Sequence, residues 1–350
     1  MLLRLILMPF ALVYGCVTSV RNLLFDIGVL RQRKFPLPVI CVGNLAVGGT
    51  GKTPHVEYLI RLLSPRCSVA VLSRGYGRRT HGFVRAAQGV TAAELGDEPF
   101  QMHDKYPAVT VAVDENRCHG INRLLHGANA TPDVVLLDDA YQHRYVHAGL
   151  YILLTEYGRL YADDCLLPAG RLRESRRGAR RARLIIVTKC PPRLTATDME
   201  HIRRRLRPTE GQQLYFTTLS YGTPRPLVGN ESPAGSGNAA TALLITGIAH
   251  PEPLQRHLES RGMTVRALTF PDHHAFTPAD VRRMNDAYDR LPDGSAAYTT
   301  EKDAARLRPL ARLLSPALCA ALHVQPVETT FLNETSDKFN QTIIDYVTKN

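Results

Sequence analysis

The residues that most clearly indicate chemistry form the octet AVGGTGKT, which has the spacing of a phosphate-binding P-loop with alanine in place of its first glycine. Small residues let successive backbone N–H groups surround the phosphates of a nucleotide. The lysine is expected to reach the β and γ oxygens, and the threonine after it is expected to bind Mg²⁺. The residues predicted to bind the nucleotide are Ala46, Val47, Gly48, Gly49, Thr50, Gly51, Lys52 and Thr53.

Two adjacent acids, Asp138 and Asp139, follow the apolar run Val134–Leu137. Alone, acids after a strand are typical of a helix cap or turn. Behind a P-loop, this is the place of the acid that holds Mg²⁺, directly or through water. We therefore predict Thr53, Asp138 and Asp139 as metal ligands, and we expect Gln142 and His143, on the loop that follows, to reach nucleotide or substrate.

The identity of the nucleotide base is indicated by a late strand. GTP-binding relatives carry Asn-Lys-x-Asp there, and the aspartate pairs with guanine. Here the run Leu184–Val187 leads into Thr188–Pro191, which has no acid at the fourth position. The sequence therefore predicts ATP. Val47 also stands where the membrane-associated partitioning ATPases carry a second lysine.

Three further polar clusters lie on predicted loops, at Ser73–Gly77, Gly96–Pro99 and Asp272–His274. Each also has a purely structural interpretation. The two glycines of the first are typical of a turn, the acids of the second cap a helix well, and a histidine in the third is ordinarily structural or solvated. These clusters acquire roles only together with the resemblance described below.

The elements that position these residues are short apolar runs alternating with helical stretches such as His55–Leu63 and Arg117–Leu125. Continuous apolar runs are typical of parallel strands covered on both faces. The expected fold is an α/β, P-loop NTPase-like, doubly wound and mostly parallel sheet. Its predicted strands are Val39–Val42, Ser68–Leu72, Val109–Val113, Val134–Leu137, Tyr151–Leu154 and Leu184–Val187.

A second, smaller α/β lobe is expected after Gly222–Gly237, a stretch rich in Gly, Pro and Ser. Predicted domains are a membrane-associated helix at 1–34, a kinase core at 35–222, a linker at 223–237 and a lobe at 238–350. The predicted elements of that lobe are strands Leu243–Ile245, Val265–Phe270 and Ala297–Thr299 and helices Pro278–Arg290 and Phe331–Val347.

The amino terminus carries an apolar run, Leu5–Val20, between Arg4 and Arg21. As a helix it extends about 24 Å, which is short for a bilayer core of about 30 Å. Together with the basic residues Arg31, Arg33 and Lys34 it indicates a helix in the membrane interface. A secretory signal and a buried helix are the alternatives. The missing small-x-small cleavage pattern and an ATP site argue against the signal.

The chain of 350 residues has a net charge of +11, so an anionic partner is expected. Arginines concentrate in Arg171–Arg183 and Arg203–Arg207, which are typical of solvated faces. No nucleic-acid recognition module is visible, so a lipid or substrate surface fits better. Seven scattered cysteines without a C-x-x-C pair indicate neither zinc nor disulfides. The sequence does not indicate an oligomeric state.

Taken in order, these segments resemble one family, the lipid A 4′-kinases, which are the tetraacyldisaccharide 4′-kinases of lipopolysaccharide synthesis. The resemblance covers about residues 36–310, and a short amino-terminal membrane helix is also a family trait. It rests on the motifs VGNLAVGGTGKTP, LSRGYGRR, GDEP, LLDDAYQHR, LLPAGRLRES, ITGIAHPEP, FPDHH and TTEKDAARL.

The resemblance implies transfer of the ATP γ-phosphoryl group, with Mg²⁺, to the 4′-hydroxyl of an acylated glucosamine disaccharide 1-phosphate, at the cytoplasmic face of the inner membrane. It makes Asp97 the base at the acceptor hydroxyl, paired with His273. It places Arg173 and Glu174 beside the reacting phosphate and metal, and makes Tyr76, Gln142 and His143 line the site. Two residues depart from the family pattern, Ser175 in place of a common proline and His274 after the Asp-His pair.

Two other functions remain open from the sequence. A membrane-associated P-loop ATPase switch would act through a protein partner, and it should tolerate the loss of Asp97. A kinase for a soluble sugar should work without lipid or detergent and should tolerate deletion of residues 1–30. A lipid A 4′-kinase should lose phosphate transfer without Asp97, and it should depend on lipid or detergent and on residues 1–30.

Overall fold

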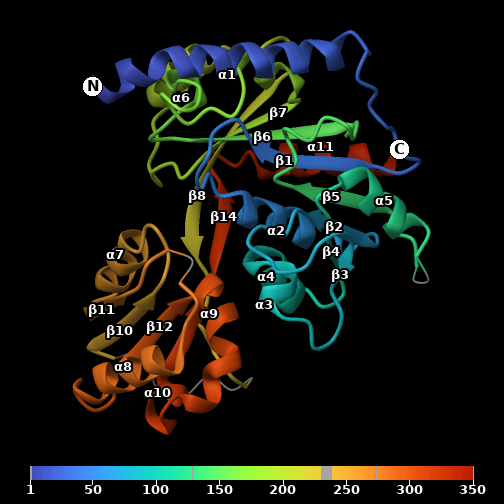
Figure 1. Ribbon diagram of the computed structural model, residues 1–350. Helices are drawn as coiled ribbons and strands as arrows, with labels where there is room; N and C mark the ends of the chain where they lie inside the picture. Colours follow the sequence, from blue (N-terminus) through green and yellow to red (C-terminus); the bar gives the residue numbers. More distant parts are fainter. Residues whose placement is uncertain (1, 128–129, 230–238, 273, 350) are drawn as a thin grey trace. The chain divides into compact units, whose positions relative to one another are not determined.

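The computed structural model describes residues 2–127, 130–229, 239–272 and 274–349, with side chains from residue 4 onwards. The chain divides into two compact units (Figure 1). The first comprises Met1–Leu219 together with Thr329–Asn350, and the second comprises Ser220–Glu328.

The first unit is built on a sheet that has nine strands within the described residues, in the order β14-β8-β7-β6-β1-β5-β2-β4-β3. The neighbours from β8 through β4 pair in parallel, and the short edge strand β3 is antiparallel. This confirms the predicted doubly wound, mostly parallel α/β fold. The strands are β1 (Val39–Asn44), β2 (Val69–Ser73), β3 (Val84–Arg85), β4 (Thr110–Val113), β5 (Val134–Asp138), β6 (Leu150–Glu156), β7 (Leu184–Thr188), β8 (Gln213–Tyr221) and β14 (Val327–Phe331).

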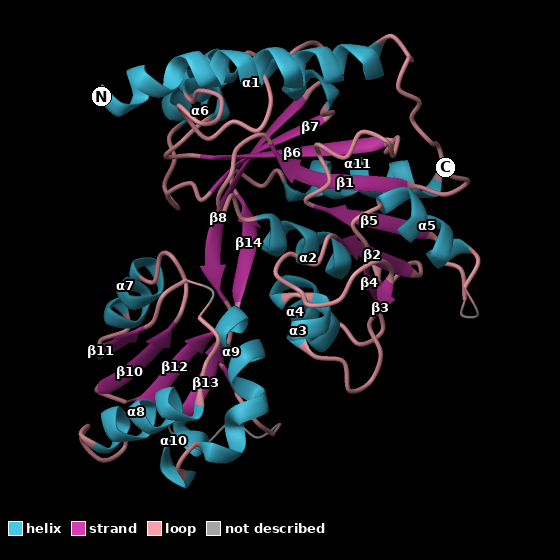
Figure 2. Cartoon of the chain, viewed as in Figure 1, coloured by secondary structure: helices cyan, strands magenta, loops and turns pink. Residues whose placement is uncertain are grey.

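Both faces of this sheet are buried, as the continuous apolar runs predict. Along β1, Val39 and Cys41 belong to one apolar core, whereas Ile40 and Val42 belong to another. Successive side chains of a strand point to opposite faces, so each face needs its own cover. Figure 2 shows the helices that flank the sheet. They include α2 (Lys52–Leu63), α3 (Ala92–Leu95), α4 (Asp97–Lys105), α5 (Arg117–Leu125), α6 (Ala196–Leu206) and α11 (Ser336–Thr348).

The second unit has its own sheet, which contains five strands in the described part of the chain, in the order β11-β10-β12-β13-β9. Strands β10 to β13 pair in parallel, and β9 closes one edge antiparallel. The elements are β9 (Arg225–Pro226), β10 (Thr241–Thr246), α7 (Glu252–Ser260), β11 (Thr264–Thr269), α8 (Pro278–Asp289), β12 (Ala296–Thr300), α9 (Glu301–Leu307), α10 (Pro316–Ala321) and β13 (Leu322–Gln325).

The carboxyl-terminal segment differs from the predicted lobe at 238–350, because residues 329–350 belong to the first unit. The predicted helix Phe331–Val347 begins only at Ser336, since Phe331 ends strand β14. The buried face of α11, with Phe339 and Ile343, packs in the same core as β1 and α2. An amphipathic pattern predicts that a helix is buried but not which sheet buries it. In the predicted linker at 223–237, Arg225 and Pro226 form β9, and residues 230–237 lie outside the described residues.

The amino-terminal helix α1 (Leu2–Asp26) contains the whole apolar run predicted from the sequence. Residues 4–26 form a helix long and apolar enough to cross a membrane by length and composition. One face turns inward and buries Ala11, Gly15 and Phe25. The opposite face exposes large apolar side chains, of which Phe10 and Val13 are 63% and 66% exposed. A helix with its apolar face outward is the reverse of an ordinary surface helix.

Candidate active site

The predicted P-loop joins the end of β1 to the start of α2. Gly48 and Gly51 have φ angles of 111° and 82°, which favour glycine. A second segment holds the first part of the loop. The Val47 N–H donates to the Arg171 carbonyl over 2.8 Å, and the Arg173 N–H donates to the Leu45 carbonyl over 2.7 Å. The first part of the loop is therefore fixed by two backbone hydrogen bonds to one neighbouring segment.

His55, one turn into α2, braces the far end of the loop. Its Nδ1 lies 2.7 Å from the Gly51 carbonyl and its Nε2 lies 3.1 Å from Thr217 Oγ1. Because a carbonyl can only accept, Nδ1 carries the proton and Nε2 accepts from the hydroxyl. Burial lowers the pKa of His55 to about 4, so the ring is neutral. His55 was not predicted as a site residue, since only the folded loop reveals its contacts.

Lys52, the lysine of the predicted P-loop, is held by one of the two acids. Lys52 Nζ lies 3.6 Å from Asp139 Oδ2. Arg173 approaches both oxygens of the same carboxylate, each at 3.2 Å. Asp139 thus balances two cations at once, and its φ of 46° holds it in the left-handed region.

The other acid, Asp138, is almost fully buried and lacks such a balance. The Ser73 hydroxyl donates to Asp138 Oδ2 over 3.1 Å, but Oδ1 has no hydrogen-bond partner among the described residues. Burial above all, and then the carboxylates of Glu98 and Asp139, raise the pKa of Asp138 to about 7, although Lys52 and Ser73 oppose the rise. An unsatisfied buried carboxylate oxygen of this kind fits a bound divalent cation.

The described residues contain no group of three or more His, Cys, Asp or Glu side chains that could hold a metal ion on their own. Mg²⁺ does not require such a cage, because it commonly keeps waters and binds one or two carboxylates together with substrate phosphates. The hydroxyl of Thr53, on the first turn of α2, and the carboxylate of Asp138 are donors of the right kind.

Glu174 is buried and fully engaged. Its two oxygens accept from Arg181 over 2.8 and 2.9 Å in a bidentate pair, and they also accept from Asn22 and Gln142. Gln142 in turn donates to the Asn44 carbonyl at the end of β1 over 2.8 Å. The structure therefore places Glu174 and Gln142 in one network that fixes the segment carrying Arg173.

Helix α1 contributes directly to this network. Its Tyr14 hydroxyl donates to the Arg173 carbonyl over 2.7 Å, Arg21 donates to the Gln142 carbonyl over 3.2 Å, and Asn22 donates to Glu174 over 2.8 Å. Arg21 and Asn22 follow Tyr14 by about two helical turns, so the three polar residues lie on one side of an apolar helix. That arrangement was the signal available in the sequence, from which only a membrane anchor was predicted.

The loops that carry Tyr76 and Asp97 lie against each other. A side chain at Gly96 would come within 2.9 Å of the Tyr76 carbonyl oxygen, so Gly96 permits a close approach. Asp97, half-buried, opens α4, and Tyr76 is 81% exposed. Glu98, which follows Asp97, lies close enough to Asp138 to raise its pKa. The fold thus brings the GDEP motif to the acids at the end of β5.

Of the two histidines predicted to lie at the site, the structure describes His143 but not His273. His143 is half-buried, and its Nε2 has no hydrogen-bond partner among the described residues. Burial first, and then Arg117, lower the pKa of His143 to about 4, so it is neutral. His273 lies outside the described residues. Its neighbour His274 bonds Asp280 over 2.9 Å and stacks on Phe270 within the second unit.

Comparison with known proteins identifies a single family. The family model for tetraacyldisaccharide-1-P 4′-kinase matches residues 3–347. Tetraacyldisaccharide 4′-kinase of Bacteroides thetaiotaomicron is 48% identical over 98% of this chain and 93% of that protein. The protein of the same name from Flavobacterium johnsoniae is 47% identical over 100% of this chain and 98% of its own length.

A solved structure agrees with these relatives. The crystal structure of LpxK from Aquifex aeolicus in complex with ATP superposes with a TM-score of 0.75 at 30% identity, and the match covers 99% of each chain. Sequence and fold therefore lead to the same assignment over the whole length. The chain belongs to the tetraacyldisaccharide-1-P 4′-kinase family.

Proposed function

We propose that this chain is an ATP-dependent kinase that phosphorylates the 4′-hydroxyl of a tetraacyldisaccharide 1-phosphate, a lipid A precursor, and so yields lipid IVA. The proposal rests on the contacts at the P-loop. There the carboxylate of Asp139 lies 3.6 Å from the Lys52 ammonium and 3.2 Å from the Arg173 guanidinium. Family membership along the whole chain supplies the acceptor and disfavours a partner-binding switch.

ATP would bind with its phosphates against the backbone N–H groups of Ala46–Thr53, at the positive end of α2. Lys52 and Arg173 now share the carboxylate of Asp139, and both would turn to the phosphate oxygens when the nucleotide arrives. Thr53 and Asp138, with Asp139 beside them, would hold Mg²⁺. That ion, when bound, neutralises charge on the phosphates.

The transfer needs a base, because a sugar hydroxyl is a poor nucleophile. Asp97 would take the proton of the 4′-hydroxyl while its oxygen bonds to the γ-phosphorus. The bond from that phosphorus to the bridging oxygen breaks, and ADP leaves. Arg173 would stabilise the charge on the transferring group, and Glu174 would hold the segment in place. His273 is proposed, on the family pattern, to orient Asp97, and Tyr76, Gln142 and His143 are proposed to contact the substrate.

An acylated acceptor must be collected from a membrane. The exposed apolar face of α1, with Phe10, Val13 and Val17, would lie in the inner membrane at its cytoplasmic face, where ATP is available. Tyr14 and Asn22 on the opposite face bond to the active site. We propose that α1 in this way holds the catalytic residues close to the lipid surface.

The test is transfer of labelled γ-phosphate to the acylated disaccharide in detergent micelles. Asp97→Asn should reduce transfer by about 1,000-fold, the scale expected for a lost catalytic base, while ATP binding persists. Asp104→Asn, on the exposed side of the same helix, is the matched control and should retain activity. Absence of labelled lipid with the wild-type chain, or an active Asp97→Asn variant, would contradict the proposal.

A further inference from the structure

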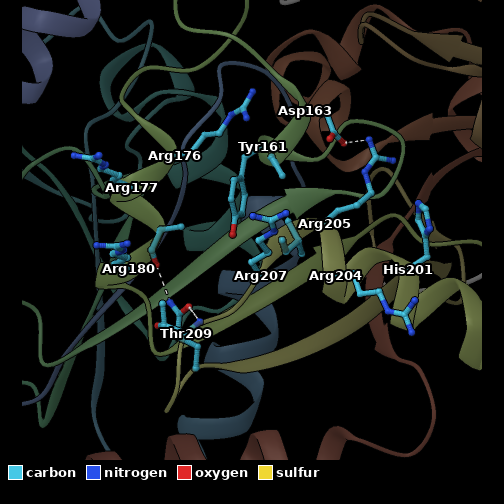
Figure 3. Close-up of a pocket in the computed structure, with 14 residues that line it drawn as sticks. Tyr161, Asp163, Arg176, Arg177, Arg180, His201, Arg204, Arg205, Arg207 and Thr209 are labelled. Atoms are coloured by element: carbon cyan, nitrogen blue, oxygen red, sulfur yellow. Dashed lines mark hydrogen bonds and ion pairs between the residues drawn. The ribbon is translucent and has the colours of Figure 1, made fainter.

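A second basic region lines a cavity of about 730 Å³, and no P-loop residue is among its lining. It is formed by η1 (Tyr161–Asp163), η2 (Arg176–Arg181), α6 and the turn after α6. Figure 3 shows the side chains that line this cavity. Among the described residues that line the cavity, Asp163 is the one acid, and six are arginines: Arg176, Arg177, Arg180, Arg204, Arg205 and Arg207. We refer to these six residues and Tyr161 as the arginine pocket.

Half of these arginines have partners that hold them in place. Arg205 pairs with Asp163 over 2.6 Å, Arg176 donates to the Asp164 carbonyl over 2.8 Å, and Arg204 pairs with Glu200 over 3.0 Å. In contrast, Arg177, Arg180 and Arg207 have no ion pair within the described parts of the chain. The pocket therefore holds positive charge that the protein does not neutralise.

Two further observations indicate a ligand. Tyr161 is 5% exposed and lines the cavity, and its hydroxyl makes no hydrogen bond to the described residues. Arg207 ends α6 in the left-handed conformation, with φ 47° and ψ 60°, at a position that favours glycine. An arginine kept at such a position, in a cavity that also has a tyrosine hydroxyl without a protein partner, matches the needs of a bound phosphate.

The arginine pocket borders the amino-terminal end of α1. A neighbouring hollow of about 590 Å³ shares Asp163 and Arg205 with it and reaches Arg4 of α1. Arg4 lies 3.8 Å from Asp164, whose backbone carbonyl accepts from Arg176. The next residues of the helix are apolar and exposed, with Leu5 at 61% and Ile6 at 58%. Unneutralised arginines thus lie next to an apolar surface.

We propose that the arginine pocket binds the phosphate headgroup of an anionic phospholipid of the bilayer in which α1 lies. This rests on the membrane attachment proposed above. A phospholipid supplies both chemistries found here, a phosphate for the arginines and acyl chains for the exposed face of α1. Nucleic acid fits poorly, because the described lining residues include no Phe or Trp and their one tyrosine, Tyr161, is buried and cannot stack on bases.

The experiment compares binding of the full chain to vesicles of phosphatidylcholine and to vesicles that also contain phosphatidylglycerol. The variant carries Arg177→Gln, Arg180→Gln and Arg207→Gln. The control carries Arg203→Gln, Arg256→Gln and Arg282→Gln, which remove the same charge from exposed positions outside the pocket. Each basic residue near an anionic surface contributes about a fivefold gain. The pocket variant should therefore lose about 100-fold of the gain caused by phosphatidylglycerol, and the control should lose far less.

Kinase activity in detergent without anionic lipid shows whether the phosphate that the pocket binds belongs to a phospholipid or to the substrate. The pocket variant should keep its kcat and its KM for the disaccharide 1-phosphate, because no catalytic residue is altered. A raised KM would assign the pocket to the substrate and overturn the proposal. Arginine-dependent binding of inorganic phosphate or of an oligonucleotide, without a gain from phosphatidylglycerol, would also overturn it.

The wild-type chain on the two kinds of vesicle separates this proposal from the one on which it rests. Equal binding to both kinds would overturn the headgroup site and leave membrane attachment standing. Binding to neither would overturn the attachment itself, and the headgroup site with it. Equal losses in the pocket variant and the control would reduce the effect to general charge and contradict a built site.

Discussion

At the P-loop, Lys52 and Arg173 share the carboxylate of Asp139, whereas Arg177, Arg180 and Arg207 of the arginine pocket have no acid paired with them in the described residues. Both regions gather positive charge for phosphate. A site that binds and releases a nucleotide at every turnover needs an acid to hold its cations when the phosphate leaves. A site that keeps a headgroup does not. We infer that charge balance, more than charge itself, distinguishes a site that releases its phosphate at every turnover from a site that retains one.

The largest expected difference between the two regions is the effect of substituting Lys52. Lys52→Ala should reduce kcat/KM for phosphoryl transfer by about 1,000-fold, because one preorganised charge at the transferring group contributes on that scale. The same variant should bind phosphatidylglycerol vesicles like the wild-type chain. Both are measured on one preparation, by transfer of labelled phosphate and by vesicle sedimentation. If Lys52→Ala also abolished the gain from phosphatidylglycerol, the two regions would be one site.

The P-loop and the sheet could be predicted because their signals are local. A continuous apolar run such as Val134–Leu137 predicts a strand buried on both faces, and β5 covers it. The pairing of Val47 with Arg171 could not be predicted, since no local pattern links segments so far apart. The return of α11 to the first sheet depends in the same way on long-range packing of Phe339.

The candidate site residues could be identified from the sequence, but the side chains that contact them could not. Asp138 and Asp139 are chemically identical and adjacent, yet one is buried with an unsatisfied oxygen and the other holds two cations. Successive side chains of a strand point to opposite faces of the sheet, so two adjacent carboxylates at the end of a strand lie in different environments. The difference arises from Ser73, Lys52 and Arg173, which the fold gathers from distant elements.

A second contrast concerns the histidines of the two regions, His55 behind the P-loop and His201 at the arginine pocket. The pKa of His55 is lowered from 6.5 to about 4 in the folded chain, so the native state resists protonation. Stability from this residue is complete above pH 6.5 and is lost as the pH falls towards 4. The loss should reach about 3 kcal/mol in the free energy of unfolding.

Thermal unfolding followed by circular dichroism across this pH range measures the effect. His55→Gln should flatten the pH dependence between pH 6.5 and 4, and should cost stability at pH 7 through the lost contacts to Gly51 and Thr217. His201→Gln removes an exposed histidine and no buried hydrogen bond, so it should change the melting temperature little. A His55→Gln variant with the same pH profile as the wild-type chain would refute the bracing role.

The smallest expected effect concerns α1, which links the two regions, since Arg4 borders the arginine pocket and Asn22 donates to Glu174. Asn22→Ala removes one of several hydrogen bonds to a carboxylate that Arg181 still holds. We expect a loss of about 1 kcal/mol, seen as up to about a fivefold decrease in kcat/KM in detergent. Ser19→Ala, on the exposed side of the same helix, should leave kcat/KM unchanged.

Because Asn22 lies at the P-loop end, phosphatidylglycerol should still increase vesicle binding of Asn22→Ala as in the wild-type chain. If that gain fell while kcat/KM held, α1 would serve the lipid surface alone, and its contacts to Arg173 and Glu174 would be structural.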